Sequence, residues 1–338
     1  MGERLVVFTE GTNGPAYGID EEIIRRGGGT PLYVSASSQA ERAEMARSAE
    51  VLIVGSAAMT RDFFSALPNL KGLVRSGIGV DAVDVAAATD LGIVVANVPD
   101  FCKQEVAEHT LALIFAVARK IARIDHRIRK GQWRGLIPTQ ILPIYRLSGQ
   151  TLGVVGIGKI GLVVAQKAQA LGLKIVGFDP YLAPGVAAAI GIPLLSLDEL
   201  LQQSDIVSLH VPLTAETRHL INARTLALMK PKSILINVAR GPIVDETALQ
   251  MALESGHLAG AGLDVLEQEP PAVSNGLFNF ENIVFTSHYA SCSVEAYRDL
   301  RRQVSEQAAE ILRGEFPRNL VNREVMNLPQ CRLGQKER

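Results

Sequence analysis

Several features that define whole classes of protein are missing from this sequence. It carries 34 Lys and Arg against 35 Asp and Glu, so it lacks the positive surplus with which proteins hold nucleic-acid backbones. It has only three cysteines, far apart and in no metal-binding spacing, which argues against a disulfide framework. Its apolar runs fall short of the ~18 residues that a membrane-spanning helix needs, and its first residues lack the apolar core of a signal peptide. We therefore expect a cytoplasmic protein that binds neither nucleic acid nor a membrane.

What the sequence does contain is a regular alternation between short apolar runs and helical patterns. This alternation is typical of the α/β class, in which parallel strands are joined by helices. The 338 residues suffice for about two such domains, at roughly 100–200 residues each. The first part of the chain fits a small doubly wound domain, with strands predicted at residues 5–8, 32–34, 51–54, 72–74 and 93–95.

Two long helical patterns interrupt this alternation. The first is predicted over residues 104–130 and ends at Gly131, with one apolar stripe and a basic second half that we interpret as a solvated face. The second is predicted over residues 293–313 and is closed by Gly314. The stretch 131–149 contains proline and has no period, so we expect it to pack against another surface, such as a second subunit. The last residues, about ten in number, are predicted to form a loose tail.

A glycine-rich motif carries the clearest functional signal. Gly156, Gly158 and Gly161 form a GxGxxG pattern that closes a predicted strand and opens a predicted helix. In a dinucleotide-binding βαβ unit, the first glycine permits a tight turn, the second admits the pyrophosphate to the backbone, and the third lets helix and strand pack closely. The next predicted strand ends at Asp179, whose carboxylate can accept hydrogen bonds from the ribose hydroxyls and would repel a 2′-phosphate. We therefore predict a NAD site.

Each of three later predicted strands is followed by a side chain suited to hydride-transfer chemistry. Ligands of open α/β sheets bind outside the carboxyl ends of the strands. There Arg240 can grip a substrate carboxylate with two hydrogen bonds and polarise the neighbouring carbonyl. His288 can exchange the hydroxyl proton as hydride moves, and Glu269 can orient its imidazole and favour the charged form. The three strands are predicted at residues 233–238, 259–264 and 283–286.

Other reactive side chains receive a structural interpretation. His109 lies one helical turn after Glu105, a spacing that suits a pair of metal ligands, but no third or fourth ligand is evident, so we expect no metal site. His210 is expected to shape the backbone near the adenine pocket. Cys292 is interpreted as a buried bystander rather than a thiol of the site. Surface positions are expected for His126, His219 and His257.

The chain resembles the D-isomer-specific 2-hydroxyacid dehydrogenase family along nearly its whole length. The matching segments occur in the family's order, and their number makes the resemblance specific. They are residues 76–81 (SGIGVD), 156–161 (GIGKIG), 210–214 (HVPLT), 237–245 (NVARGPIVD), 262–265 (GLDV), 269–271 (EPP) and 286–290 (TSHYA).

The resemblance implies an architecture and a set of residue roles. It implies a Rossmann NAD domain at 102–290 inserted into a discontinuous, flavodoxin-like substrate domain at 1–101 and 291–338, in a homodimer. It assigns catalysis to Arg240, Glu269 and His288. Substrate binding is assigned to Ser76, Gly77, Ile78, Gly79 and again Arg240. Cofactor contacts are implied for Gly156, Gly158, Lys159, Ile160, Gly161, Asp179, His210, Val211, Pro212, Val238, Ala239, Arg240, Asp264, His288 and Ala290, with Asp264 near the carboxamide.

The resemblance leaves the substrate open. Residues 98–106 are similar to the branch that includes the C-terminal-binding-protein corepressors and many bacterial dehydrogenases, and phosphoglycerate dehydrogenases look similar too. Gly55 and Met59 stand where the latter usually carry basic residues, which argues against a phosphorylated substrate, although Arg75 remains. We predict NAD-dependent interconversion of a small 2-oxo acid and its D-2-hydroxy acid. The alternatives are a NAD(H)-sensing interaction protein and a dehydrogenase specific for phosphoglycerate or for glyoxylate and hydroxypyruvate.

Overall fold

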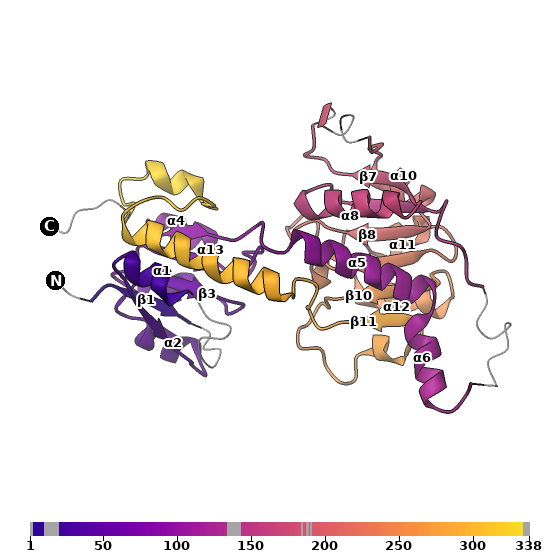
Figure 1. Cartoon of the computed structure of the whole chain (residues 1–338), viewed down its shortest axis with the longest axis horizontal. Helices are drawn as coiled ribbons and strands as arrows, with labels where there is room; N and C mark the ends of the chain where they lie inside the picture. The colour runs from indigo at the N-terminus through magenta and orange to yellow at the C-terminus, as the bar shows by residue number, and fades with distance from the viewer. Residues whose placement is uncertain are drawn as a thin grey trace. The chain divides into compact units, whose positions relative to one another are not determined.

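Two parallel sheets, each covered by helices on both faces, make up the computed structural model of the chain (Figure 1). The structure describes residues 3–9, 20–133, 143–183, 185, 186, 189 and 191–333. The chain divides into two units, one of residues 1–101 with 293–338 and the other of residues 102–292. The predicted α/β fold class with two doubly wound sheets is confirmed. In the part of the chain that is described, no helix is long and apolar enough to cross a membrane.

The sheet of the first unit has the strand order β2-β1-β3-β4-β5, which is the flavodoxin-like order. Its middle strand, β3, is completely buried from Val51 to Val54, as expected for a parallel strand covered on both faces. Val51 and Ile53 point to the cluster under α13, whereas Leu52 and Val54 point to the cluster under α3 and α4. The strands are β1 (Leu5–Phe8), β2 (Thr30–Tyr33), β3 (Ala49–Val54), β4 (Gly72–Arg75) and β5 (Val94–Ala96). The helices are α1 (Glu21–Arg26), α2 (Gln39–Met45), α3 (Arg61–Ser65), α4 (Val85–Asp90), α13 (Val294–Leu312) and the short η3 (Arg323–Asn327).

The end of the chain departs from the sequence prediction. Helix α13 agrees with it, since the Ser293 side chain caps the first turn and Gly314 follows the last with a φ of +80°. The predicted loose tail is wrong for residues 329–333, because Cys331 and Leu333 are only 8% and 7% exposed. The Arg332 guanidinium donates hydrogen bonds to backbone carbonyls of loops in the first unit, and this fastens the segment. The accepting residues are Leu67, Leu70 and Leu91.

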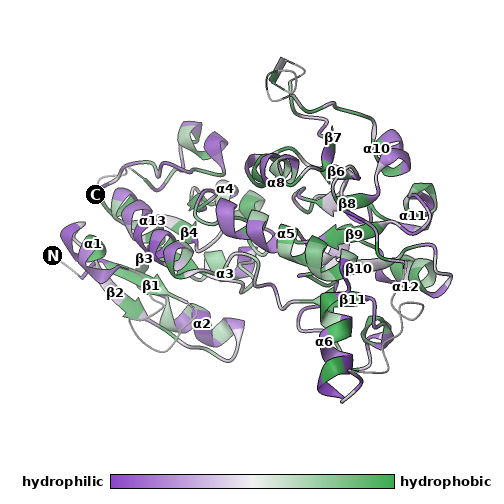
Figure 2. Cartoon of the chain, turned by 45° about the vertical axis from the view of Figure 1, so that its right-hand side comes forward, coloured by the Kyte–Doolittle hydropathy of each residue, from purple (hydrophilic) through white to green (hydrophobic). Residues whose placement is uncertain are grey.

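The sheet of the second unit has the order β11-β10-β9-β8-β6-β7. All its strands are parallel, and between β6 and β8 the order in which successive strands are added changes from one side of the sheet to the other. Such a switch point is where α/β sheets bind ligands. Figure 2 shows α10, α11 and α12 on one face of the mainly hydrophobic strands, with α5 and α8 on the other. The strands are β6 (Thr151–Val155), β7 (Lys174–Phe178), β8 (Ile206–Leu209), β9 (Ile234–Asn237), β10 (Gly260–Leu263) and β11 (Ile283–Phe285). The helices are α5 (Lys103–Ala118), α6 (Ile121–Arg129), α8 (Lys159–Ala170), α10 (Leu197–Gln203), α11 (Ala223–Leu228), α12 (Glu246–Glu254) and the short η1 (Gly241–Ile243) and η2 (Gly276–Asn279).

The first long helix is broken, contrary to the prediction of one helix over 104–130. α5 ends at Ala118, and Lys120 adopts a left-handed backbone with a φ of +54° before α6 begins. The apolar stripe is buried along α5, but it does not continue into α6, where Ile121 is 54% exposed. Two arginines of the basic half pair with Glu281, at 3.1 Å from Arg123 and 3.8 Å from Arg127. Residues 134–142 of the stretch expected to pack against another surface lie outside the described residues.

Candidate active site

The three predicted catalytic residues follow adjacent strands of the second unit. β9, β10 and β11 are neighbours and run parallel, so their carboxyl ends share one edge of the sheet. Arg240, Glu269 and His288 lie in the loops after these strands. The structure brings Glu269 and His288 into contact, with the carboxylate Oε2 of Glu269 2.7 Å from Nδ1 of His288.

This acid–imidazole pair has the geometry of a proton-transfer group. A carboxylate can only accept, so Nδ1 carries the shared proton and Nε2 is the nitrogen left for a substrate. Burial raises the pKa of Glu269, but the hydrogen bond and charge of His288, the N–H of Leu266 and the charge of Arg240 outweigh it, so this pKa lies below its usual 4.5. Glu269 therefore stays ionised at neutral pH, and its carboxylate orients the imidazole through this hydrogen bond.

A buried carboxylate holds the loop that carries His288. Asp264, which is 2% exposed, follows β10, and its two carboxylate oxygens accept hydrogen bonds from the backbone N–H groups of Tyr289 and Ala290 at 2.8 and 3.0 Å. The backbone N–H of His288 itself donates to the Asp264 carbonyl at 2.7 Å. His288 has a φ of +58°, a left-handed conformation that costs a non-glycine residue about 1–2 kcal/mol. These hydrogen bonds hold the strained turn that presents the imidazole.

Sequence analysis missed two residues that support this carboxylate. The Thr286 hydroxyl donates to Oδ1 of Asp264 at 2.5 Å, and Nε2 of His109 lies 2.9 Å from the Thr286 oxygen. His109 comes from the face of α5 that also carries the buried Val106 and Leu113. A histidine within a helix's buried stripe was the signal that could have identified it. Among the described residues, no group of three or more His, Cys, Asp and Glu could hold a metal ion.

A buried asparagine shapes the turn that carries Arg240. The Asn237 side chain accepts from the Ala239 N–H at 3.1 Å and donates to the Arg240 carbonyl at 2.9 Å. A Cβ on Gly241 would collide with the Leu266 carbonyl, so only glycine lets this turn approach the loop that leads to Glu269. The parallel strands β9, β10 and β11 bring Arg240 to the same edge as the acid–imidazole pair, and the Arg240 charge helps to lower the pKa of Glu269.

The glycine motif has the geometry that a dinucleotide requires. Gly156 has a φ of +94°, which makes the sharp turn after β6. A Cβ on Gly161 would collide with the Gly156 carbonyl, so this glycine allows α8 to pack closely. A Cβ on Gly158 would enter open space, at the first turn of a helix whose N-terminal N–H groups have no side-chain cap. That space above exposed N–H groups fits a pyrophosphate.

Asp179 stands at the end of β7 beside this turn. Its Oδ2 accepts from the Ile157 N–H at 3.0 Å, and its Oδ1 accepts from the Tyr181 N–H at 3.0 Å. Each carboxylate oxygen accepts about two hydrogen bonds, so the side chain is fixed and retains capacity for hydroxyl donors.

The remaining residues expected to touch the cofactor lie at the same edge of the sheet or on the first turns of α8. Burial lowers the pKa of His210 to about 3, so its ring is neutral, and Nε2 lies 2.8 Å from the Ser208 hydroxyl oxygen. The backbone of His210 faces Gly156, which agrees with a backbone-shaping role. Lys159 and Ile160 begin α8 after Gly158, Val211 and Pro212 follow β8, Val238 and Ala239 follow β9, and Ala290 follows β11.

The predicted substrate loop belongs to the first unit. Residues 76–79 follow β4, and the N–H of Ser76 donates to the Val54 carbonyl at 2.7 Å. Gly77 has a φ of +150°, and a Cβ there would collide with the Arg75 guanidinium, which donates to the Ser76 carbonyl. The carbonyl of Ile78 accepts from the Asn97 side chain at 2.7 Å. The loop is thus a tight glycine turn held from both sides.

The other singled-out side chains lie as follows. Cys292 is half-buried rather than buried. His126 is exposed, whereas the other two histidines expected at the surface are half-buried and bonded. Nε2 of His219 lies 2.8 Å from the Glu267 carboxylate, and Nε2 of His257 lies 3.0 Å from the Leu226 carbonyl oxygen.

Comparisons with known proteins show which proteins this chain is similar to. Residues 111–290 match the model of the D-isomer specific 2-hydroxyacid dehydrogenase NAD binding domain. The chain is 40% identical over 296 residues to a D-3-phosphoglycerate dehydrogenase of Methanocaldococcus jannaschii, covering 87% of this chain and 55% of that protein, so it spans about half the length of this relative. It is also 40% identical to a glyoxylate reductase of Korarchaeum cryptofilum, over 79% of this chain and 80% of that one. The solved structure of an Aquifex aeolicus D-lactate dehydrogenase with NAD and lactic acid has a TM-score of 0.83 at 29% identity, covering 94% of this chain and 99% of that chain.

Proposed function

Because the chain belongs to the D-isomer-specific 2-hydroxyacid dehydrogenase family of NAD(P)-dependent oxidoreductases, we propose a reaction of that class for it. The proposed reaction interconverts a small, unphosphorylated 2-oxo acid and its D-2-hydroxy acid. The observation that carries the proposal is the 2.7 Å contact between Glu269 and His288 at the carboxyl edge of the NAD-binding unit. An acid-supported imidazole at this edge supplies the proton that accompanies hydride transfer to a carbonyl.

In the reducing direction, each residue of the set has one task. Arg240 binds the substrate carboxylate, and its guanidinium polarises the carbonyl beside it. The resemblance to the family also assigns the backbone of residues 76–79 to substrate binding. NADH, held by the glycine motif and Asp179, would supply the hydride. Nε2 of His288 donates a proton to the oxygen that becomes the hydroxyl, and the Glu269 carboxylate stabilises the imidazolium beforehand. In the oxidising direction the same nitrogen accepts the proton.

The proposal extends to the cofactor and the assembly. The Asp179 carboxylate favours NADH over NADPH, because its charge would repel a 2′-phosphate. The first unit serves as the substrate domain, and the resemblance to the family supports a homodimer.

A substrate panel tests the proposal directly. NADH oxidation is measured with glyoxylate, hydroxypyruvate, pyruvate and 3-phosphohydroxypyruvate, and each reaction is repeated with NADPH. We expect turnover with at least one unphosphorylated acid and a lower kcat/KM with the phosphorylated one. Arg240→Ala and His288→Ala should lower kcat/KM by roughly 10²–10⁴-fold while NADH binding is kept. Near-normal turnover in both variants would refute the assignment, and NAD-dependent assembly without any turnover would favour an interaction protein.

A further inference from the structure

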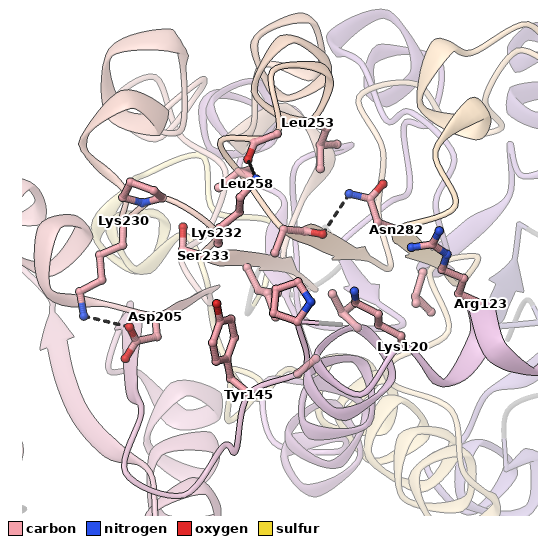
Figure 3. A pocket seen from close by; sticks show the side chains of 18 of the residues that line it. Lys120, Arg123, Tyr145, Asp205, Lys230, Lys232, Ser233, Leu253, Leu258 and Asn282 are labelled. Carbon is pink, nitrogen blue, oxygen red and sulfur yellow. Dashed lines mark hydrogen bonds and ion pairs between the residues drawn. The ribbon is translucent and has the colours of Figure 1, made fainter. Parts of the chain in front are cut away.

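A cavity lies at the edge of the same sheet opposite the catalytic residues. It measures about 600 Å³, a size that suits a metabolite, and it lies wholly within the 102–292 unit (Figure 3). Asp205, Ser233, Ala259 and Asn282 line it, and each comes immediately before a strand, namely β8, β9, β10 and β11. The catalytic residues follow the other ends of these strands. The cavity is therefore separate from the dinucleotide and substrate sites.

The lining carries more positive than negative charge. Four cationic side chains face two carboxylates, and both carboxylates are already engaged. Lys230 pairs with Asp205 at 2.9 Å, and Arg123 pairs with Glu281 at 3.1 Å. The other two cations are lysines from separate loops, which Figure 3 shows around the same hollow. An anion that entered it would meet a positive surplus.

The first of these lysines is Lys120, in the break between α5 and α6. Its pKa is lowered by burial and by the charge of the neighbouring Arg123. A bound anion would relieve both effects, because it would compensate the desolvated ammonium and screen the two cations from each other.

The second is Lys232, whose ammonium donates to the Gly256 carbonyl at 2.5 Å, just beyond the end of α12. Both lysines have left-handed backbones, with φ of +54° for Lys120 and +66° for Lys232. Glycine would be the less strained residue at either position. Lysine stands at both, which indicates that the side chains have a use.

A buried hydroxyl provides an independent observation. Ser233 is 2% exposed and lines the cavity, yet its hydroxyl has no hydrogen-bond partner among the described residues. Buried polar groups are almost always bonded, so an orphan at a cavity wall points to a missing occupant. The serine side chain turns about a single torsion, so its hydroxyl can change direction without movement of the backbone.

The rest of the lining is suited to the uncharged, apolar part of a small molecule. Val117, Leu258 and Val284 present aliphatic surface, and Tyr145 adds a ring on the exposed side, where its residue is 58% exposed. Such a mixture of apolar walls and a few converging polar groups is typical of small-molecule sites.

We propose that this cavity binds a small organic anion, whose phosphate or carboxylate group is held by Lys120, Lys232 and Ser233 while its apolar body packs against Tyr145 and the aliphatic wall. The proposal does not rest on the catalytic assignment. The alternative is a purely structural role, in which the two lysines only compensate the partial negative charge at the C-terminal ends of α5 and α12.

Isothermal titration calorimetry of the full chain with saturating NADH tests the proposal. Phenyl phosphate and benzoate are the probes, because they share one body and differ in the anionic group, and phenol is the neutral control. We expect one or both anions to bind wild type, more weakly as salt is raised, with no binding of phenol. The tighter anion identifies the class of head group.

The variants locate the binding. Lys120→Met with Lys232→Met should weaken it roughly tenfold or more, because two charged contacts are lost while each Cβ is kept. Lys174→Met, which removes an exposed lysine at the start of β7, should bind as wild type does. Lys120→Arg with Lys232→Arg keeps both charges and should retain binding, which separates loss of charge from misfolding.

Ser233→Ala supplies a milder probe of the same site. It removes a hydroxyl that has no partner in the described structure, so the melting temperature should not fall, while anion affinity should drop roughly threefold or more. Turnover should stay normal in all of these variants. The proposal is overturned if neither anion binds wild type, or if the double methionine variant binds with unchanged affinity.

Discussion

The Thr286 hydroxyl donates a 2.5 Å hydrogen bond to the buried carboxylate of Asp264. This contact joins the end of β11 to the end of β10, and Thr286 lies two residues before His288 in the sequence. The same carboxylate oxygen accepts the N–H of Tyr289, so a change at Thr286 acts on the anchor of the His288 loop.

Thr286→Val is therefore expected to impair both stability and turnover. It deprives a buried carboxylate of a donor, which should lower the free energy of unfolding by about 1–3 kcal/mol. Turnover should fall even well below the melting temperature, because the His288 loop loses its support, whereas NADH affinity should change little. Urea denaturation and steady-state kinetics measure the two effects. Thr286→Ser keeps the hydroxyl and should restore both, and a valine variant with wild-type turnover would contradict the anchoring role.

Glu269→Gln should slow reduction without unfolding the protein. The pKa of Glu269 lies below 4.5, so the wild-type carboxylate is charged wherever the enzyme is assayed and accepts the hydrogen bond from Nδ1 of His288. Glutamine has no such charge, so the maximal kcat, measured by steady-state kinetics, should drop roughly 10²-fold. A near-normal kcat in the variant would show that the carboxylate does not support the imidazole.

Alanine substitutions at two glycines of one motif should affect different properties, NADH affinity at Gly158 and stability at Gly161. A Cβ at Gly158 enters open space, so Gly158→Ala should alter the free energy of unfolding by less than about 0.5 kcal/mol while NADH affinity falls roughly tenfold or more. A Cβ at Gly161 meets the Gly156 carbonyl, so Gly161→Ala should lose about 1–3 kcal/mol of stability. Thermal unfolding and NADH fluorescence titration distinguish the two variants. If both variants lost the same amount of stability, the interpretation that a Cβ at Gly158 enters open space would be wrong.

His210 should make the protein sensitive to acid. Its pKa is about 3 when folded against 6.5 ordinarily, so the unfolded chain binds a proton that the folded chain does not. Stability must then rise with pH across this interval, and acidification should remove up to ~1.4 kcal/mol per pH unit.

The measurement is urea denaturation at a series of pH values from 6.5 down toward 4. His210→Gln should flatten this part of the stability curve, and His126→Gln, at an exposed position, should leave it as in wild type. A curve with the same slope in both variants would count against a neutral His210 in the folded protein.

Local sequence signals were sufficient for much of the fold. β1 has the predicted bounds, and β9, β10 and β11 lie within their predicted ranges, because short apolar runs between glycines and polar residues mark buried parallel strands. The contact between Glu269 and His288 was also foreseeable, since parallel strands bring their carboxyl ends to one edge.

What the sequence could not reveal depends on contacts between distant residues. The helix break at Lys120 has neither glycine nor proline to mark it. The docking of residues 329–333 depends on carbonyls that Arg332 reaches about 240 positions earlier in the chain. The support of Asp264 by Thr286 and His109 joins three separate segments. None of these has a local pattern.

Helix α13 belongs to the first unit although it follows the second unit in the sequence, and this affects the order in which the two units can fold during synthesis. Ala308 and Ile311 of α13 complete the apolar cluster over one face of the first sheet. Residues 102–292 are synthesised between that sheet and this helix, and as a continuous stretch they have their whole core as soon as they leave the ribosome. Translation thus begins the first unit before residues 102–292 and completes it after them.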